Sequence, residues 1–115
     1  MFEKRQAARL DLPDPLTGDI LAKYEVRVVN LSVEGAGIEH EVMLRPGQPC
    51  FLRVTLTDRA VFICASVMWS CASRFGGEGN SVIYQTGLKF ERVPETTRNE
   101  LAVFLATKKS DSRER

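Results

Sequence analysis

Two neighbouring segments alternate apolar and polar residues and are separated by only two residues, which constrains the fold more than any other feature of the chain. Residues 50–57 alternate in this way, and residues 60–69 place one apolar set on a common face: Val61, Ile63, Ala65, Val67 and Trp69. Alternation of this kind predicts β-strands that each bury one face. The connection Asp58-Arg59 has the length of a tight hairpin turn. We therefore expect an antiparallel hairpin at the centre of the fold.

Further strands and turns follow from the same kind of pattern. Residues 19–29 alternate, with Ile20, Ala22, Tyr24, Val26 and Val28 on the apolar face. Residues 12–18 carry two prolines and a glycine, so we expect a turn there rather than a central strand. Residues 36–40 and 82–91 are predicted to be extended, and the glycine-rich stretch within 70–80 to be a surface loop.

The end of the chain has the period of a helix. After Pro94, residues 95–107 place Leu101, Phe104 and Leu105 at helical spacing. Residues 108–115 are polar or charged, and we expect them to be a disordered tail. The whole pattern predicts an all-β domain over residues 1–107. We expect a six-stranded antiparallel β-barrel with a C-terminal α-helix, preceded by a polar arm of residues 1–9.

Length and charge restrict the classes of function. A chain of 115 residues is long enough for one hydrophobic core but not for two stable ones. A net charge of +1 argues against a broad basic surface for long nucleic acids, so any anionic ligand is expected to be small. The sequence has no apolar run of the roughly 20 residues that cross a bilayer, and its first ten residues include four charged ones where a signal peptide would be apolar. We expect a cytoplasmic protein without membrane insertion.

The cysteines and the single histidine do not form a recognisable reactive set. Cys50, Cys64 and Cys71 lie in apolar sequence surroundings and are interpreted as reduced core thiols. With His40 as the only histidine and no paired C-x-x-C spacing, a four-ligand zinc site is not expected. No acid, base and nucleophile can be named together. We therefore expect neither catalysis nor a metal or cofactor.

Two short motifs remain unexplained by folding alone. The first is Arg5-Gln6-Ala7-Ala8-Arg9, an R-x-x-x-R, and the second is Asn30-Leu31-Ser32-Val33-Glu34-Gly35, an N-x-S-x-x-G. Each has a structural alternative, because N-terminal arginines are often solvated and an Asn-x-Ser sequence often closes a hairpin turn. Together and in this order they resemble the signature of the PilZ domain family. Val67-Met68-Trp69 and Gly87-Leu88-Lys89-Phe90 resemble two later strands of that family, so the likeness covers about residues 3–107.

The resemblance implies a binding site for the bacterial second messenger cyclic di-GMP. A guanidinium can bond to guanine O6 and N7, stack on the base or clamp a phosphate, and these roles fall to Arg5 and Arg9. Asn30 and Ser32 would present an amide oxygen and a hydroxyl from one face of a strand, and Gly35 would allow a reversal with positive φ. The family more often has aspartate where this chain has Asn30, which lowers the expected affinity.

Several other residues are secondary candidates. Lys4 is a possible third cation of the arm, although a solvated lysine is the simpler interpretation. Trp69, Phe90 and Tyr84 are interpreted as core residues rather than stacking platforms, because they lie in alternating strands.

The resemblance also implies an output. We expect a stand-alone receptor, a monomer or weak dimer, whose arm changes conformation on binding and signals to a protein partner, as in bacterial control of motility and biofilms. The main alternative is a PilZ-fold interaction module of the pilus or motility type that does not bind nucleotide. A small barrel that binds single-stranded nucleic acid ranks below it, because the outward strand charges are mixed.

Overall fold

The computed structural model describes residues 9–76 and 78–113. Its strands are β1 (Leu10–Ile20), β2 (Tyr24–Leu31), β3 (Gly35–His40), β4 (Pro49–Thr55), β5 (Ala60–Phe75) and β6 (Val82–Phe90). A short 3-10 helix, η1 (Glu78–Asn80), lies between β5 and β6, and the α-helix α1 (Glu95–Arg113) follows β6.

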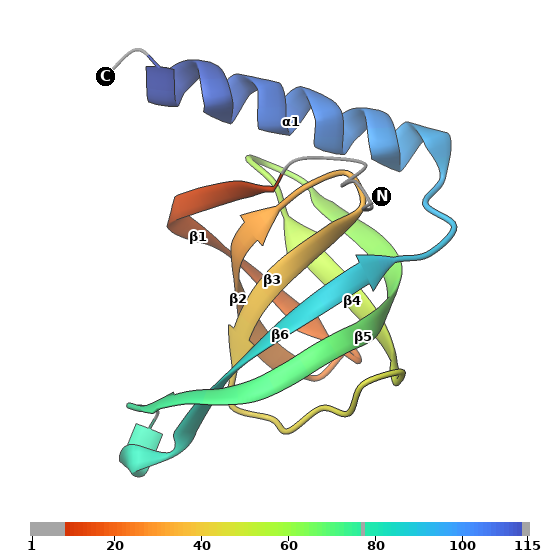
Figure 1. Ribbon diagram of the computed structural model, residues 1–115. Helices are drawn as coiled ribbons and strands as arrows, with labels where there is room; N and C mark the ends of the chain where they lie inside the picture. Colours follow the sequence, from red (N-terminus) through yellow and green to blue (C-terminus); the bar gives the residue numbers. More distant parts are fainter. Residues whose placement is uncertain (1–8, 77, 114–115) are drawn as a thin grey trace, which may run out of the picture.

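The strands form one closed barrel in the order β1-β2-β3-β6-β5-β4 (Figure 1). All neighbouring strands are antiparallel, and β1 closes the barrel by pairing with β4, where Gly18 lies opposite Val54. The predicted hairpin is present as β4 and β5, with the Leu56 amide donating to the Arg59 carbonyl oxygen at 2.8 Å. The six-stranded antiparallel barrel with a C-terminal helix is therefore confirmed.

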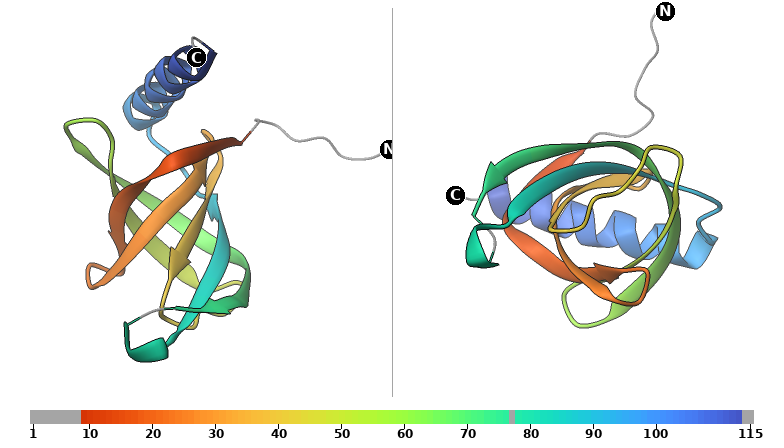
Figure 2. Two further views of the ribbon diagram at one scale, coloured as in Figure 1. Left: turned by 90° about the vertical axis from the view of Figure 1, so that its left-hand side faces the viewer. Right: turned by 90° about the horizontal axis from the view of Figure 1, so that it is seen from below.

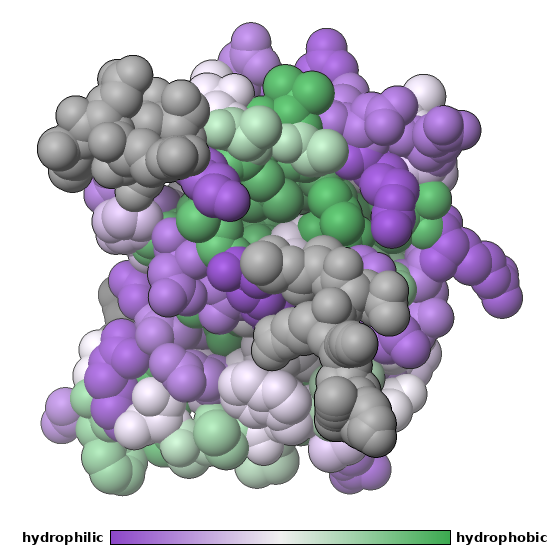
Figure 3. Space-filling view, turned by 45° about the horizontal axis from the view of Figure 1, so that its top comes forward, coloured by the Kyte–Doolittle hydropathy of each residue, from purple (hydrophilic) through white to green (hydrophobic). Residues whose placement is uncertain are grey.

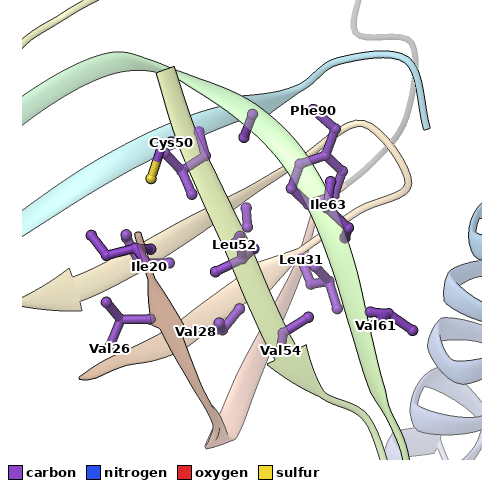
Figure 4. Packing of buried hydrophobic residues seen from close by; sticks show 14 of the residues in the cluster. Ile20, Val26, Val28, Leu31, Cys50, Leu52, Val54, Val61, Ile63 and Phe90 are labelled. Carbon is purple, nitrogen blue, oxygen red and sulfur yellow. The ribbon is translucent and has the colours of Figure 1, made fainter. Parts of the chain in front are cut away.

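The barrel interior is filled by the apolar face of each alternating strand. Ile20, Val28, Leu52 and Val54 are fully buried, and Ile63 is 1% exposed (Figure 4). Burying a side chain of this size contributes about 1.5–3 kcal/mol to folding. These residues come from strands far apart in the sequence, so the core fixes which strands meet and with which register.

The proline-rich segment is part of a strand, and the prediction of a turn over residues 12–18 is wrong. β1 runs through Pro13 and Pro15, and the register of its pairing with β2 shifts between Asp11 and Leu16. Proline cannot donate to the ladder, but a bulge leaves residues unpaired where no donor is needed. The segment therefore stays extended and forms part of the barrel wall.

The chain reverses later than predicted, at residues 21–23. Leu21 and Ala22 have φ of 56° and 57°, and the Lys23 amide donates to the Ile20 carbonyl oxygen at 3.0 Å. Two successive left-handed residues produce a tight turn whose twist suits the antiparallel pair that it connects. The predicted strand over residues 19–29 is therefore divided between β1 and β2, and Ala22 does not belong to its buried face.

Strand β5 is longer than predicted. It continues to Phe75 through residues that were expected to be loop. It stays paired with β6 over this length, and the last pair is Phe75 with Val82. The resulting β5–β6 hairpin extends past the rest of the barrel (Figure 1). Residues 70–75 contain neither glycine nor proline, so no residue in this stretch favours leaving the strand.

Glu39 attaches this hairpin to the neighbouring strands. It forms ion pairs with Arg27 of β2 and with Arg74 of β5, the latter at 3.2 Å, and it accepts a bond from Gln85 Nε2 of β6 at 3.3 Å. Hydrogen bonds from Arg74, and further ones from Arg27 and Gln85, lower the pKa of Glu39 to about 2. One carboxylate on β3 thus connects three other strands.

Helix α1 lies across one end of the barrel (Figure 2). It buries Leu101 and Phe104, and apolar side chains gather on the surface at this end of the molecule (Figure 3). The helix begins where predicted but continues to Arg113, past residue 107, so residues 108–113 are helical rather than a disordered tail. Lys108 Nζ lies 5.6 Å from the centre of the Phe104 ring, one turn earlier, which favours the continuation. Within residues 9–76 and 78–113, no helix has the length and apolar character that crossing a membrane requires.

Candidate ligand-binding site

The reversal between β2 and β3 is held by the side chain of Ser32. Its Oγ accepts hydrogen bonds from the amides of Glu34 at 3.0 Å and Gly35 at 3.1 Å, while the Ser32 amide donates to the Gly35 carbonyl oxygen at 2.9 Å. The residue is only 2% exposed. The Ser32 hydroxyl is thus engaged within the turn, which differs from the prediction that it would face a ligand beside Asn30.

Gly35 is required for close packing rather than for a special backbone angle. Its φ lies outside the left-handed region, so the expectation of positive φ is wrong. A Cβ at this position would lie 2.4 Å from the Leu88 carbonyl oxygen on β6 and 3.1 Å from Arg9 Nη2. The missing side chain therefore lets β3 approach β6 and leaves room for the Arg9 guanidinium.

Arg9 and Asn30 bring the two sequence motifs together. Arg9 immediately precedes β1, whose residue Asp11 pairs with Asn30 near the end of β2. Arg9 Nη1 donates to Asn30 Oδ1 at 2.8 Å. The Asn30 amide lies over Gly37 of β3, where a Cβ would be 2.6 Å from its Nδ2 atom. The amide oxygen thus orients the guanidinium at the end of the β2 strand.

The Arg9 side chain lines an open groove of about 780 Å³ near the start of α1. The turn formed by residues 32–34 forms part of the groove wall. Trp69 of β5, residues of β6 and the connection from β6 to α1 form other parts of it. Its cationic side chains are Arg9, Lys89, Arg92 and Arg98, and its acidic side chain is Glu34. The described wall of this groove is therefore suited to an anionic ligand.

Trp69 belongs to this groove, and its prediction as a core residue is wrong. The pairing of β5 with β6 shifts between Val67 and Trp69, so the extra residue reverses the alternation and turns Trp69 outward. Its side chain is 49% exposed and lies across β6, where a Cβ on Gly87 would be 2.4 Å from the indole Nε1. An indole presented in this way can stack on a planar base.

The other two aromatic predictions agree better with the structure. Phe90 is buried at 7% exposure, as expected of a core residue, although it also contributes to the groove wall. Tyr84 is half-buried and stacks on the His40 ring, with 6.1 Å between the ring centres. Burial lowers the pKa of His40, and its Nε2 atom lies 2.6 Å from Thr86 Oγ1. His40 therefore packs in the barrel wall away from the groove.

The cysteines differ in their surroundings. Cys50 is 2% exposed, and burial raises the pKa of its thiol to about 11, so it is a protonated core residue as predicted. Cys64 and Cys71 are exposed on β5, and their prediction as core thiols is wrong. All three are free thiols. Within the described ranges, no group of three or more His, Cys, Asp and Glu residues is arranged to hold a metal ion.

Sequence reasoning identified only part of this site. Lys4 and Arg5 lie outside the described residues. Lys89, Arg92 and Arg98 were not predicted, because each is an isolated cation in its own segment and no spacing connects it to Arg9. Arg92 has a φ of 50°, an uncommon angle for a residue with a side chain, at the point where β6 leads into α1. Only the closed barrel brings these cations to one groove.

Comparison with known proteins places the fold. The family model of the PilZ domain matches residues 3–107. The PilZ domain with c-di-GMP of YcgR from Escherichia coli superposes with a TM-score of 0.76 at 18% identity, covering 97% of this chain and 96% of that one. The inhibitor of motility MotI/DgrA of Bacillus subtilis gives 0.75 at 15% identity, covering 99% of this chain and 54% of that chain.

A third solved structure is similar over the same region. The MrkH–c-di-GMP complex of K. pneumonia superposes with a TM-score of 0.70 at 14% identity, covering 99% of this chain and 57% of the MrkH chain. A search of curated protein sequences gave no match. The barrel order, the two joined motifs and the match of the family model over most of the sequence lead to one conclusion: the chain belongs to the PilZ domain family.

Proposed function

We propose that the groove binds cyclic di-GMP and that the chain is a receptor for this second messenger. The observation that carries the proposal is the hydrogen bond by which Asn30 holds Arg9 at the edge of a cationic groove. The similar structures of the YcgR PilZ domain and of MrkH are complexes with c-di-GMP, which supports the choice.

The charge of the groove suits the two phosphates of the ligand. Arg9 and Lys89 lie on the barrel side of the groove, and Arg92 and Arg98 lie on the connection to α1 and on α1 itself. Hydrogen bonds between such cations and a phosphate are about twice as strong as neutral ones. Among the described residues of the wall, the one acidic side chain is that of Glu34, whose amide lies in the turn held by Ser32.

The guanine bases provide the specificity in this proposal. A guanidinium matches the two acceptors of the guanine edge, O6 and N7, whereas adenine has a donor at the position of O6. We assign this contact to Arg9 and to Arg5, four residues earlier in the R-x-x-x-R motif. The exposed indole of Trp69 provides a stacking surface in the same groove.

Ser32 and Gly35 support the site indirectly. The Ser32 hydroxyl fixes the turn that forms one wall, and Gly35 leaves the space in which the Arg9 guanidinium lies. Their contribution to affinity is therefore expected to come mainly through the shape of the turn. Lys4 is retained as a possible additional cation of the arm.

The output that we propose is a change in the position of the N-terminal arm. A ligand held by Arg5 and Arg9 would be in contact with Arg98 of α1 as well, so binding would connect the arm to the helix. A protein partner in the cytoplasm would then bind the surface that the arm forms in its new position. The proposal assigns no catalytic step and no cofactor to the chain.

Calorimetric titration of the purified protein with cyclic di-GMP tests this function directly. We expect saturable binding that is at least ten times tighter than binding of cyclic di-AMP, because the adenine edge reverses part of the hydrogen-bond pattern (about 1.4 kcal/mol per factor of ten). Equal binding of both dinucleotides would remove the proposed basis of recognition. Absence of binding would favour a PilZ-fold interaction module that does not use nucleotide.

A further inference from the structure

The side-chain acceptors of the N-x-S-x-x-G motif are already engaged within the protein. Asn30 Oδ1 accepts a hydrogen bond from Arg9 Nη1 at 2.8 Å, and Ser32 Oγ accepts from the amides of Glu34 and Gly35. Guanine carries two donors, N1–H and the 2-amino group, side by side on its Watson–Crick edge. A groove that binds this edge of the base therefore needs another acceptor.

Glu34 supplies the one carboxylate among the described residues of the groove wall. It is half-buried, and within residues 9–76 and 78–113 its carboxylate takes part in no ion pair or side-chain hydrogen bond. The charged side chains around it on the wall are cations. A carboxylate at this place opposes the binding of phosphates unless it makes a favourable contact of its own with the ligand.

The backbone of Glu34 is held from both sides. Its amide donates to Ser32 Oγ at 3.0 Å, and its carbonyl oxygen accepts from the Phe90 amide of β6 at 2.9 Å. The indole of Trp69 lies across Gly87 of the same strand. The rise along β6 from Gly87 to Phe90 is about 10 Å, at about 3.3 Å per residue. A purine stacked on the indole and the side chain of Glu34 can together bridge this distance.

We propose that Glu34 accepts hydrogen bonds from N1–H and the 2-amino group of one guanine and thereby selects guanine over purines that lack the amino group. The inference rests on the proposed binding of cyclic di-GMP and adds a residue that determines its specificity. The two oxygens of a carboxylate accept both donors at once, and charge-assisted bonds are about twice as strong as neutral ones. A guanidinium bonded to O6 and N7 occupies the other edge of the base, so the two contacts are compatible.

Calorimetric titration with cyclic di-GMP and cyclic di-IMP tests the contact, because cyclic di-IMP differs only in lacking the two 2-amino groups. The native protein should bind cyclic di-GMP about tenfold more tightly or better (about 1.4 kcal/mol), since one charge-assisted bond is missing with cyclic di-IMP. In Glu34→Ala, the affinity for cyclic di-GMP should fall by about tenfold or more. The preference between the two dinucleotides should fall to about twofold or less.

The matched control is Glu95→Ala. It removes the same charge from an exposed position at the start of α1, outside the groove wall, and should keep the native preference. The melting temperature of Glu34→Ala should equal that of the native protein, because Ser32 and Phe90 hold only the backbone of Glu34.

The sign of the effect separates this role from simple electrostatics. A carboxylate that only faces the groove repels the phosphates, so its removal would tighten the binding of both dinucleotides. Tighter binding in Glu34→Ala, an equal loss of affinity for both ligands, or a native protein without preference between them would overturn the assignment and leave the proposed receptor function intact. A native protein that binds neither dinucleotide would overturn both.

Discussion

Arg9 Nη1 donates a 2.8 Å hydrogen bond to Asn30 Oδ1, which joins two residues that lie 21 positions apart in the sequence. One belongs to the R-x-x-x-R motif and the other to the N-x-S-x-x-G motif. The bond orients a guanidinium beside a groove lined by three further cations, Lys89, Arg92 and Arg98. The two motifs are therefore parts of one arrangement, and the expected effects of their substitution can be compared.

Replacing Arg9 should weaken nucleotide binding more than folding. Loss of one charge-assisted contact costs about 1.5–3 kcal/mol, so Arg9→Ala should reduce the affinity for cyclic di-GMP by tenfold or more in calorimetry. Arg5→Ala should have a similar effect. Lys109→Ala is the control, because Lys109 lies on α1 outside the groove. Unchanged affinity in Arg9→Ala would contradict the assigned role of the motif.

Trp69 should report on the ligand and contribute to its binding. It is the only tryptophan of the chain, so stacking of guanine on the indole should change the intrinsic fluorescence during titration. Trp69→Ala should weaken binding by about 1–3 kcal/mol, and Trp69→Phe should retain part of the affinity. Phe62→Ala, an exposed aromatic outside the groove, should bind normally. A fluorescence signal that does not respond to saturating ligand would place the base elsewhere.

The Ser32→Ala change in the β2–β3 turn should affect thermal stability more than the affinity for cyclic di-GMP. Ser32→Ala leaves the amides of Glu34 and Gly35 without their acceptor, which costs about 1–3 kcal/mol and should lower the melting temperature by roughly 5–15 °C. Its effect on affinity should be smaller than that of Arg9→Ala. Ser73→Ala, at an exposed position, is the thermal control.

Gly35→Val tests the close packing of β3 on β6. A Cβ at Gly35 would meet the Leu88 carbonyl oxygen at 2.4 Å, so the two strands must separate. We expect a lower melting temperature and a loss of affinity together, because the same change crowds Arg9. A valine variant with native melting temperature and affinity would show that the strands can separate here without consequence.

The ion pairs of Glu39 should make stability depend on acidic pH. Its pKa is lowered from 4.5 to about 2 in the folded protein, so the contribution is complete above pH 4.5 and is lost as the pH falls toward 2. Glu39→Gln should lower the stability by about 1 kcal/mol at neutral pH and flatten the acid slope. Denaturant titrations from pH 7 to pH 2 measure both. Glu25→Gln, on the exposed face of β2, is the matched control.

The N-terminal arm should respond to ligand. If Arg5 and Arg9 hold the nucleotide, amide hydrogen exchange of residues 3–10 should slow on binding, while residues 50–57 and 60–66 change little. The comparison of free and saturated protein gives the result directly. Equal exchange of the arm in the two states would mean that the arm does not carry the signal.

The sequence by itself determined the barrel and the position of one side of the site. Strict alternation in residues 50–57 and 60–67 specifies which face is buried, because side chains of a strand point to opposite faces in turn. The helical spacing of Leu101 and Phe104 likewise specifies the face that α1 buries. The two motifs identified Arg9 and Asn30 by residue type and order, before their contact was known.

Only the tertiary structure decided where the alternation fails and which cations meet. The bulge before Trp69 depends on how β5 pairs with β6, so the alternation of residues 60–69 could not predict that this side chain points outward. The prolines of β1 are likewise accommodated by a shift in its pairing with β2. Arg92 and Arg98 reach the groove because the closed barrel carries β6 and α1 back beside Arg9. Periodicity describes a continuous strand, whereas bulges and converging charges arise from pairing between distant segments.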